Sequence, residues 1–165
     1  MAEPLSAADR SSLAAEQGPV TMGVGGLLVF EAGPGLEHAR VLERVEQRLH
    51  LIPRYRQRLQ SPAPAVTNPV WVDDDQFDLG WHVRRAALPA PGGPAELAEL
   101  VGHELSRRLD RARPLWELTV IEGVAGKGEI GVEPRGHAGQ GRAQRVVPLT
   151  QLGKLLEQPP EPRGT

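Results

Sequence analysis

The sequence predicts a mixed α/β fold that is followed by an irregular C-terminal tail. Residues 36–51 and 95–109 repeat apolar residues at helical spacing and predict two amphipathic helices. Short apolar runs bounded by glycine, proline or aspartate lie around these helices and predict strands. After Gly123 glycine becomes frequent and aliphatic residues become rare, so burial cannot offset the ordering entropy of that segment.

The N-terminal part predicts one short helix and one buried strand. Ser6, with Asp9 three residues later, partly resembles a capping box and predicts a helix over residues 6–17. Residues 20–31 form an apolar run that includes a glycine-rich turn, and they predict a buried strand. Glycines in such a run favour the close approach of another backbone or of a ligand.

The middle of the chain predicts a helix and a strand with a loop between them. The helix at residues 36–51 ends at Ile52-Pro53, because the residue before a proline avoids the helical conformation. A proline-rich loop over residues 61–69 leads to a short strand at residues 70–72. An aspartate triplet at residues 73–75 ends that strand.

The following segment predicts a strand, a turn, a helix and another strand. Residues 77–88 include an approximate alternation of polar and apolar side chains from Trp81 onward, which predicts a half-exposed strand. A turn at residues 89–94 precedes the second amphipathic helix at residues 95–109. Residues 115–122 predict the next strand.

These patterns divide the chain into an ordered part at residues 1–123 and a tail rich in glycine, arginine and proline at residues 124–165. The tail is expected to be disordered or weakly helical, and residues 133–165 are expected to be mostly irregular. Leucines at positions 152, 155 and 156 permit one or two helical turns within residues 149–158, which the prolines from Pro159 onward end.

Composition excludes several functional classes. A length of 165 residues fits one ordinary domain, and a net charge of −2 gives no overall basic field for nucleic acid or an anionic membrane. The absence of cysteine excludes disulfides, a thiol nucleophile and thiolate zinc sites. The sequence has neither a secretory signal pattern nor a run of about 20 apolar residues. We therefore expect a cytoplasmic location, which leaves peripheral contact with a membrane open.

Several sequence blocks occur in the order and spacing of one bacterial enzyme family. They are Pro4-Leu5-Ser6 with Asp9-Arg10, residues 22–27 with Phe30-Glu31, residues 53–59, residues 69–74 with 77–79 and 82–84, and residues 106–117, which contain Pro114-Leu115-Trp116. Together these blocks resemble the N-terminal part of the wax ester synthase/acyl-CoA:diacylglycerol acyltransferase family over roughly residues 3–123. The Pro-Leu-Trp sequence is a motif of that family.

The resemblance implies an incomplete lobe of a chloramphenicol acetyltransferase-like, CoA-dependent acyltransferase fold. Such enzymes have two mixed α/β lobes with the active site in a channel between them, and this chain matches most of one lobe. The family transfers an acyl group from acyl-CoA to diacylglycerol or to a long-chain alcohol, which yields triacylglycerol or wax ester. Acyl-CoA is then a co-substrate, no metal or other cofactor is expected, and a location at membranes or lipid droplets is compatible with the substrates.

The family's active-site motif, His-His-x-x-x-Asp-Gly, soon follows a strand like the one predicted here at residues 118–121. The resemblance implies that the second histidine of that motif is the general base. This chain has five histidines, none adjacent to another and none with Asp-Gly five residues on: His38, His50, His82, His103 and His137. We therefore assign no catalytic residue and expect an inactive, truncated or frame-altered family member.

Two other functional hypotheses remain open on the sequence. The first is a non-catalytic binding or regulatory lobe that associates with another acyltransferase chain through an exposed apolar face. The second, ranked last, is an active acyltransferase that uses His82 or His103. The Pro114-Leu115-Trp116 motif is expected to line a substrate channel or to serve as a scaffold, and a tryptophan at the head of an apolar strand is more typical of a core residue.

Two charged segments have weak functional interpretations. The alternating arginines Arg54, Arg56 and Arg58 form a basic edge suited to phosphate, although a solvated edge is the more common outcome. The aspartates at residues 73–75, with Asp78, lack the glycine and the glutamate that an EF-hand loop requires at its sixth and twelfth positions. The sequence thus predicts no metal site.

Overall fold

The computed structural model describes residues 3–16, 20, 22–30, 36–61 and 68–125, together with the backbone of residues 130–132 and 136–137. The irregular conformation expected over residues 133–165 and the helical turns expected at residues 149–158 lie outside the described residues, apart from one two-residue strand. No helix among the described residues is long and apolar enough to cross a bilayer.

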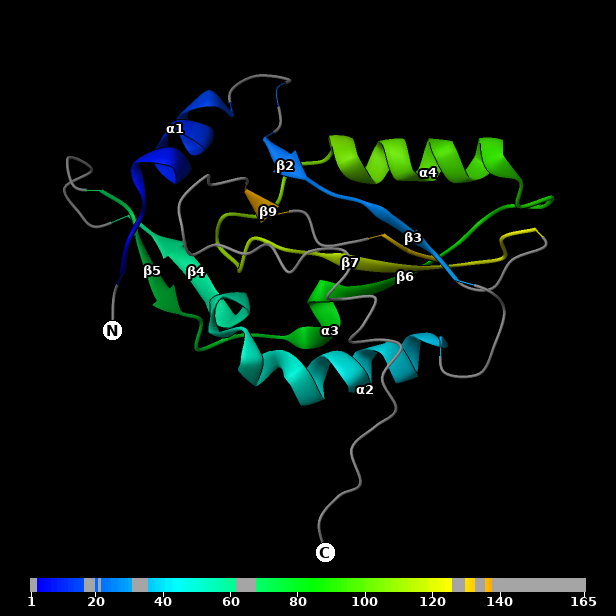
Figure 1. Cartoon of the computed structure of the whole chain (residues 1–165), viewed down its shortest axis with the longest axis horizontal. Helices are drawn as coiled ribbons and strands as arrows, with labels where there is room; N and C mark the ends of the chain where they lie inside the picture. The colour runs from blue at the N-terminus through cyan, green and yellow to red at the C-terminus, as the bar shows by residue number, and fades with distance from the viewer. Residues whose placement is uncertain are drawn as a thin grey trace, which may run out of the picture.

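Among the described residues, helices occupy the two stretches that were predicted to be amphipathic and three further places (Figure 1). The helical elements, including the 3-10 helices η1 and η2, are α1 Ala7–Ala15, α2 His38–Arg48, η1 Leu49–Leu51, η2 Pro53–Arg56, α3 Leu79–His82 and α4 Pro94–Ser106. The N-terminal helix begins as predicted, because the Ser6 hydroxyl accepts a hydrogen bond from the backbone N–H of Asp9 at 3.1 Å.

The strands form three separate sheets. They are β1 Glu3–Pro4, β2 Gly23–Val24, β3 Leu27–Val29, β4 Gln57–Gln60, β5 Val70–Asp73, β6 Val83–Ala87, β7 Leu118–Glu122, β8 Ile130–Val132 and β9 Gly136–His137. The largest sheet has the order β3-β8-β7-β6, a second has the order β1-β5-β4, and β2 pairs with β9. The structure thus confirms the mixed α/β class.

The four-stranded sheet is covered by a helix on each face. The β6 and β7 strands are parallel, so the chain must cross over between them, and α4 is that crossover helix. Figure 1 shows α4 above the sheet and α2 below it. The β7 strand contributes side chains to both faces of the sheet. Leu118 and Val120 pack on the side of α2. Ile121 packs on the other side, against the α4 residues Leu97, Leu100 and Val101.

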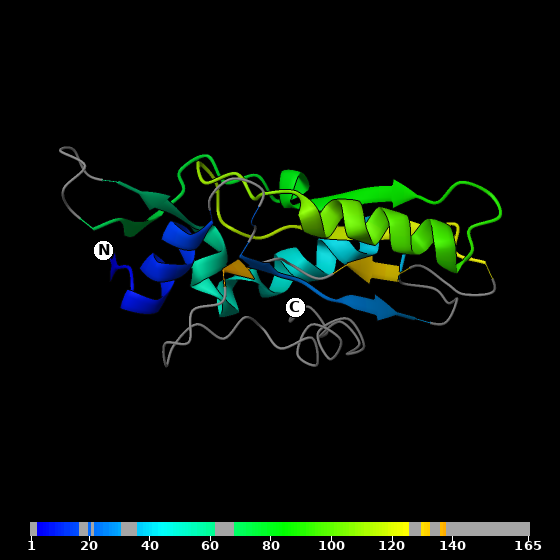
Figure 2. The same ribbon diagram turned by 90° about the horizontal axis from the view of Figure 1, so that it is seen from above.

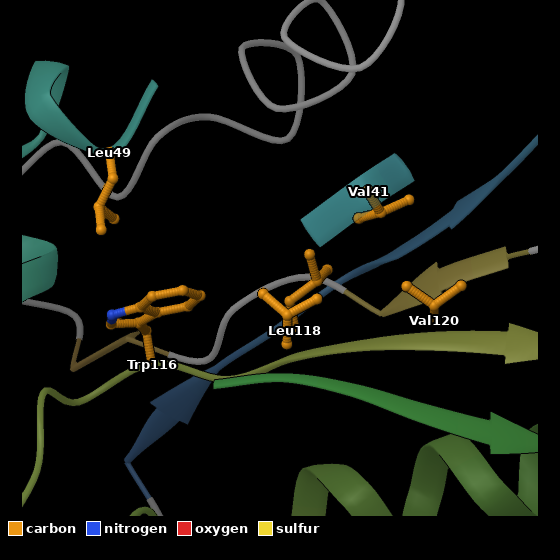
Figure 3. Close-up of a cluster of buried hydrophobic side chains, with 6 residues drawn as sticks. Val41, Leu49, Trp116, Leu118 and Val120 are labelled. Carbon is orange, nitrogen blue, oxygen red and sulfur yellow. The ribbon is translucent and has the colours of Figure 1, made fainter. Parts of the chain in front are cut away.

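Two buried clusters meet at the Pro-Leu-Trp turn. The larger cluster joins α2 to the four-stranded sheet and contains Val41, Leu49, Val83, Trp116, Leu118 and Val120, most of which are labelled in Figure 3. The smaller cluster joins the three-stranded sheet to the N-terminal segment and contains Leu5, Trp71, Leu109 and Leu115. Apolar burial in these clusters is the main stabilising term of the fold.

Residues 20–31 do not form the single buried strand that was predicted. They form β2 and β3, and Val24, Leu27 and Val29 expose 46%, 36% and 51% of their surface. The prediction was wrong because, among the described residues, β3 is the edge strand of its sheet, paired with β8, and lies beyond the part of the sheet that α4 covers. Gly23 pairs with His137 in the β2–β9 ladder, and the close approach expected of the glycines stays a prediction.

The strand predicted from Trp81 begins two residues later than expected. Residues Leu79–His82 form the one-turn helix α3, because the Asp78 carboxylate accepts a hydrogen bond from the backbone N–H of Gly80 at 2.9 Å. A local side-chain bond of this kind competes with strand pairing. From Val83 onward the predicted half-exposed strand is present as β6, in which Val83 is buried and the next four residues alternate between half-buried and exposed.

Two short strands lie beyond residue 123, the boundary that the sequence suggested for the ordered part. The β8 strand is internal to the four-stranded sheet, paired with β3 on one side and with β7 on the other. The aliphatic residues at positions 130 and 132 were the only signal for it in a glycine-rich stretch. The division at residue 123, and the character of residues 124–165 as a whole, stay predictions.

The turn before α4 requires a glycine at position 92. Gly92 has a φ of +69°, and a Cβ there would lie 1.9 Å from the backbone oxygen of Gly123. We expect Gly92→Ala to lower the free energy of unfolding by more than about 1 kcal/mol, from the left-handed backbone and from the clash. Gly102→Ala is the matched control, because nothing lies within 4 Å of its Cβ position in α4 and alanine should stabilise that helix. Urea unfolding that ranks the two variants in the opposite order would contradict this assignment.

Candidate functional site: the Pro-Leu-Trp turn

The Pro114-Leu115-Trp116 motif lies immediately before β7 and is buried throughout. Pro114 is fully buried, and Leu115 and Trp116 expose 8% and 3% of their surface. Leu115 packs in the smaller cluster, whereas Trp116 packs in the larger one. Consecutive side chains of the motif therefore connect the hydrophobic cores of two different sheets.

Trp116 stacks against two other rings, Tyr55 and His82, and we call these rings with Phe77 the aromatic stack. Tyr55 lies with its ring centroid 4.7 Å from that of Trp116, and the imidazole of His82 lies 4.5 Å from it at an interplanar angle of 14°. Phe77 stacks on His82 with ring centroids 5.1 Å apart. The indole N–H of Trp116 donates a hydrogen bond to the Tyr55 carbonyl at 2.8 Å, so the one polar atom of the side chain is satisfied. These contacts fix the orientation of the indole.

His82 is the polar member of the aromatic stack, and none of its surface is exposed. Its Nδ1 lies 2.7 Å from the Trp116 carbonyl oxygen. A carbonyl oxygen can only accept, so Nδ1 carries the proton in this bond. The other ring nitrogen, Nε2, has no hydrogen-bond partner among the described residues. Burial lowers the pKa of His82, and this keeps the ring neutral.

Glu117 follows the motif and is the buried charge of the site. Its carboxylate lies 2.5 Å from the Arg107 guanidinium and 3.5 Å from that of Arg84. Two arginines thus neutralise one buried carboxylate at the start of β7, as a buried charge requires. The Arg84 and Arg113 guanidinium groups also lie over the Trp81 ring, 4.7 and 4.6 Å from its centroid.

The other residues considered from the sequence are apart from the motif or paired locally. Arg54 forms an ion pair with Glu3 at 2.6 Å and lies over the Trp71 ring, while Arg58 lies 3.8 Å from Asp74. His103 is exposed on α4 beside Glu104. Within the described ranges no three His, Asp or Glu side chains are placed to hold a metal ion.

An open hollow of about 390 Å³ lies beside the aromatic stack. It is lined by Leu49, His50, Pro53, Arg56, Asp73, Asp74, Asp75 and Phe77. Phe77 is the only residue of the stack in that lining, and no side chain of the motif reaches it. The motif therefore does not line this hollow.

Sequence reasoning singled out the motif but missed two features of the site. It did not predict the stacking of His82 on Trp116 or the pairing of Glu117 with two arginines. Each contact joins residues that are far apart in the chain, and periodicity carries no signal for them. The one usable signal was the position of His82 between Trp81 and Val83 in a predicted strand.

The strand after the motif sets where the following chain emerges. The β8 strand is antiparallel to β7, and the register pairs Val132 with Thr119. The chain thus leaves β8 at the end of the sheet where Trp116 lies. The sequence that follows is Glu133-Pro134-Arg135, without an adjacent pair of histidines.

Comparisons of sequence and of structure find relatives in the same enzyme family. "Probable diacyglycerol O-acyltransferase tgs3" of Mycobacterium tuberculosis is 44% identical over 138 residues, which cover 83% of this chain and 51% of the relative. The wax ester synthase/diacylglycerol acyltransferase of Marinobacter aquaeolei VT8 superposes with a TM-score of 0.69 at 33% identity, covering 82% of this chain and 33% of that chain.

A more distant likeness concerns the fold alone. A mutant starter condensation domain of rhizomide synthetase, in complex with C8-CoA, superposes with a TM-score of 0.61 at 17% identity. The superposition covers 83% of this chain and 31% of the condensation-domain chain. The fold is therefore that of the chloramphenicol acetyltransferase-like acyltransferases, and this chain corresponds to about one third of these neighbours.

The family assignment rests on a match that spans most of the described structure. The model of the wax ester synthase/diacylglycerol acyltransferase catalytic domain matches residues 5–131, from the first core residue of the smaller cluster to the middle of β8. The chain spans about half the length of the curated relative tgs3. This chain belongs to the wax ester synthase/diacylglycerol acyltransferase family.

Proposed function

We propose that this chain is the N-terminal lobe of an acyl-CoA-dependent O-acyltransferase and that it transfers no acyl group by itself. The observation that carries the proposal is the buried Pro-Leu-Trp turn, together with a sequence that has no His-His-x-x-x-Asp-Gly motif. The family names support diacylglycerol or a long-chain alcohol as the acceptor in the complete enzyme. The products would be triacylglycerol or a wax ester.

The two histidines considered as possible bases, His82 and His103, are unsuited to general-base catalysis. A general base must lie within hydrogen-bond reach of the acceptor hydroxyl, and it contributes about 10²- to 10⁴-fold to the rate. His82 is fully buried, and its Nδ1 is bonded to the Trp116 carbonyl. His103 is exposed on α4 beside Glu104. Neither ring lines the hollow beside the aromatic stack, which supports an inactive lobe.

The motif is proposed to act as a scaffold. Leu115 and Trp116 lock the start of β7 to two clusters, and β8 returns to the same end of the sheet. In a complete family member the active-site motif would follow from that end. Catalytic residues need a rigid support of this kind, because their misplacement by about 1 Å lowers the reaction rate by about 10²-fold.

Acyl-CoA is the proposed co-substrate of the complete enzyme, in accord with the reaction of the family. The condensation domain with a similar fold was solved with C8-CoA, which is a statement about that protein. A cytoplasmic location, with peripheral contact to membranes or lipid droplets where the acceptor resides, completes the proposal.

The test is an acyl-transfer assay on the purified chain. Long-chain acyl-CoA is supplied with diacylglycerol or a fatty alcohol, and thiol release is followed beside the Marinobacter enzyme as the active reference. We expect no thiol release above the rate without protein. Turnover that is abolished by His103→Ala or by His82→Phe would overturn the proposal, because it would place a base where the structure gives none.

The alternative is a non-catalytic binding lobe that associates with a separately encoded acyltransferase chain. The exposed apolar residues Val24, Leu27 and Val29 favour it, because they lie close together on β2 and β3. Such a lobe should self-associate when its partner is absent. A monomer that persists at high concentration in light scattering would speak against this alternative.

A further inference from the structure

The edge strands β6, β4 and β1 carry the usual protection against pairing with another chain. The β6 strand has Arg84 and Arg85, and its Val83 carbonyl accepts a hydrogen bond from Nε2 of His38 at 2.9 Å. The β4 strand has Arg58, and β1 is two residues long and contains a proline. Charged side chains, proline and shortness at a sheet edge all oppose the addition of a further strand.

The edge strand β3 has neither a charge nor a proline. Within the described part of the chain it pairs with β8 on one side and with no strand on the other. Residues 22–30 contain no charged side chain and no proline. Leu27 and Val29 are 36% and 51% exposed, and Val24 of the adjoining β2 strand is 46% exposed. An uncharged, apolar edge of this kind is a template for another strand.

The two helices that cover the sheet leave the outer side of β3 accessible. On one face α4 packs on Ile121 of β7, and on the other face α2 contacts β6, the strand at the opposite edge. Figure 2 shows α4 over the green and yellow strands, with the blue β3 strand clear of it on one side. A strand added beside β3 would therefore extend the sheet without displacing either helix.

We propose that β3 pairs with β3 of a second copy of this chain, antiparallel about a two-fold axis. The two four-stranded sheets then form one sheet of eight strands, a size that open sheets reach. Two uncharged edges meet without the like-charge repulsion that would arise if β6 or β4 paired with itself. Antiparallel pairing of identical strands also fits the two-fold symmetry of most dimers.

The length of β3 determines the register of the pairing. An antiparallel arrangement that uses all three residues places Leu28 opposite the partner's Leu28, and Leu27 opposite the partner's Val29. Phe30 packs on the side of α2, so Leu27 and Val29 point to the other face by the alternation of side chains. The exposed side chains of both copies then contact each other across the axis. Because only a short strand pairs, we expect a concentration-dependent dimer.

Sedimentation velocity over a range of protein concentrations measures the dimer. We expect the weight-average mass of the wild type to rise with concentration from that of the monomer toward that of the dimer. Val29→Lys places a charge at the edge and should raise the dimer dissociation constant at least about tenfold. Leu51→Lys is the matched control, because it adds the same charge at a leucine that is 63% exposed on η1, and it should leave the dissociation constant unchanged.

The absence of native cysteine permits a test of the register. A Leu27→Cys chain and a tagged Val29→Cys chain are mixed under mild oxidation, and disulfide-linked dimers are separated by size. Directly opposite residues have Cβ atoms about 4.5–5.5 Å apart, whereas diagonal neighbours are about 7–8 Å apart. Disulfides need the shorter separation, so the mixture should yield at least about tenfold more linked dimer than either variant alone.

Three results would overturn the proposal. The first is a wild-type monomer at every concentration, which would leave the β3 edge to another occupant. The second is a dimer that Val29→Lys weakens no more than Leu51→Lys does, which would place the interface elsewhere. The third is equal disulfide formation in the mixed and the separate samples, which would exclude this register. None of these results depends on acyl transfer, so the dimer and the proposed function can fail independently.

Discussion

Replacing Trp116 by alanine is expected to lower the free energy of unfolding by about 3–5 kcal/mol, the usual cost of deleting a buried tryptophan. The side chain is 3% exposed and stacks against Tyr55 and His82. Its removal also leaves the Tyr55 carbonyl without the indole donor. Denaturant unfolding followed by circular dichroism measures the difference.

Trp81→Ala is the matched control, since it deletes the same group from a half-buried position. The Trp81 ring lies edge-on to His82 and under two arginine side chains, which can turn toward water when the ring is absent. We expect a clearly smaller loss of stability. Equal losses for the two variants would mean that Trp116 does not have the central packing role given to it.

Acidification is expected to destabilise the protein through His82. Burial lowers the pKa of His82 most, and Arg113 adds to this, while the bond to the Trp116 carbonyl opposes it. The unfolded chain, with a pKa of about 6.5, therefore takes up the proton first as the pH falls. The stability contribution is fully present above the unfolded pKa and is lost as the pH falls below it. One proton limits the slope to about 1.4 kcal/mol per pH unit.

Unfolding by urea at several values between about pH 7.5 and about pH 5 measures this slope. His82→Phe retains a ring in the aromatic stack but cannot titrate, so it should lose this part of the pH dependence while the wild type keeps it. It should also be less stable at neutral pH, because the Trp116 carbonyl loses its donor. A slope that His82→Phe leaves unchanged would assign the effect to other groups.

The elements with strong local patterns were predictable from the sequence. The helices α2 and α4 carry apolar residues at helical spacing, and β5 and β7 are apolar runs bounded by turn residues. The family followed from the order of several blocks, and the comparisons confirm it. Each of these signals resides within one short segment or in the spacing between segments.

The remaining features depend on contacts that a linear pattern does not contain. The β4 strand, Gln57–Gln60, has little apolar character and is held by pairing with β5. The α3 turn depends on the Asp78 side chain, and β8 depends on its two neighbours in the sheet. The exposure of β3 was missed because an apolar run does not reveal whether its strand lies at a sheet edge. For the same reason, the sequence did not place His82 in the stack.

Native-state hydrogen exchange of Trp116→Ala tests most directly the proposal that the motif unites two sheets as a scaffold. The slowest amides of β5, in the three-stranded sheet, and of β7, in the four-stranded sheet, are compared with those of the wild type. If the turn couples the two clusters, the opening free energy should fall by the same amount in both strands. A loss confined to β7, with β5 fully protected, would show that the clusters are independent and would contradict the scaffold role.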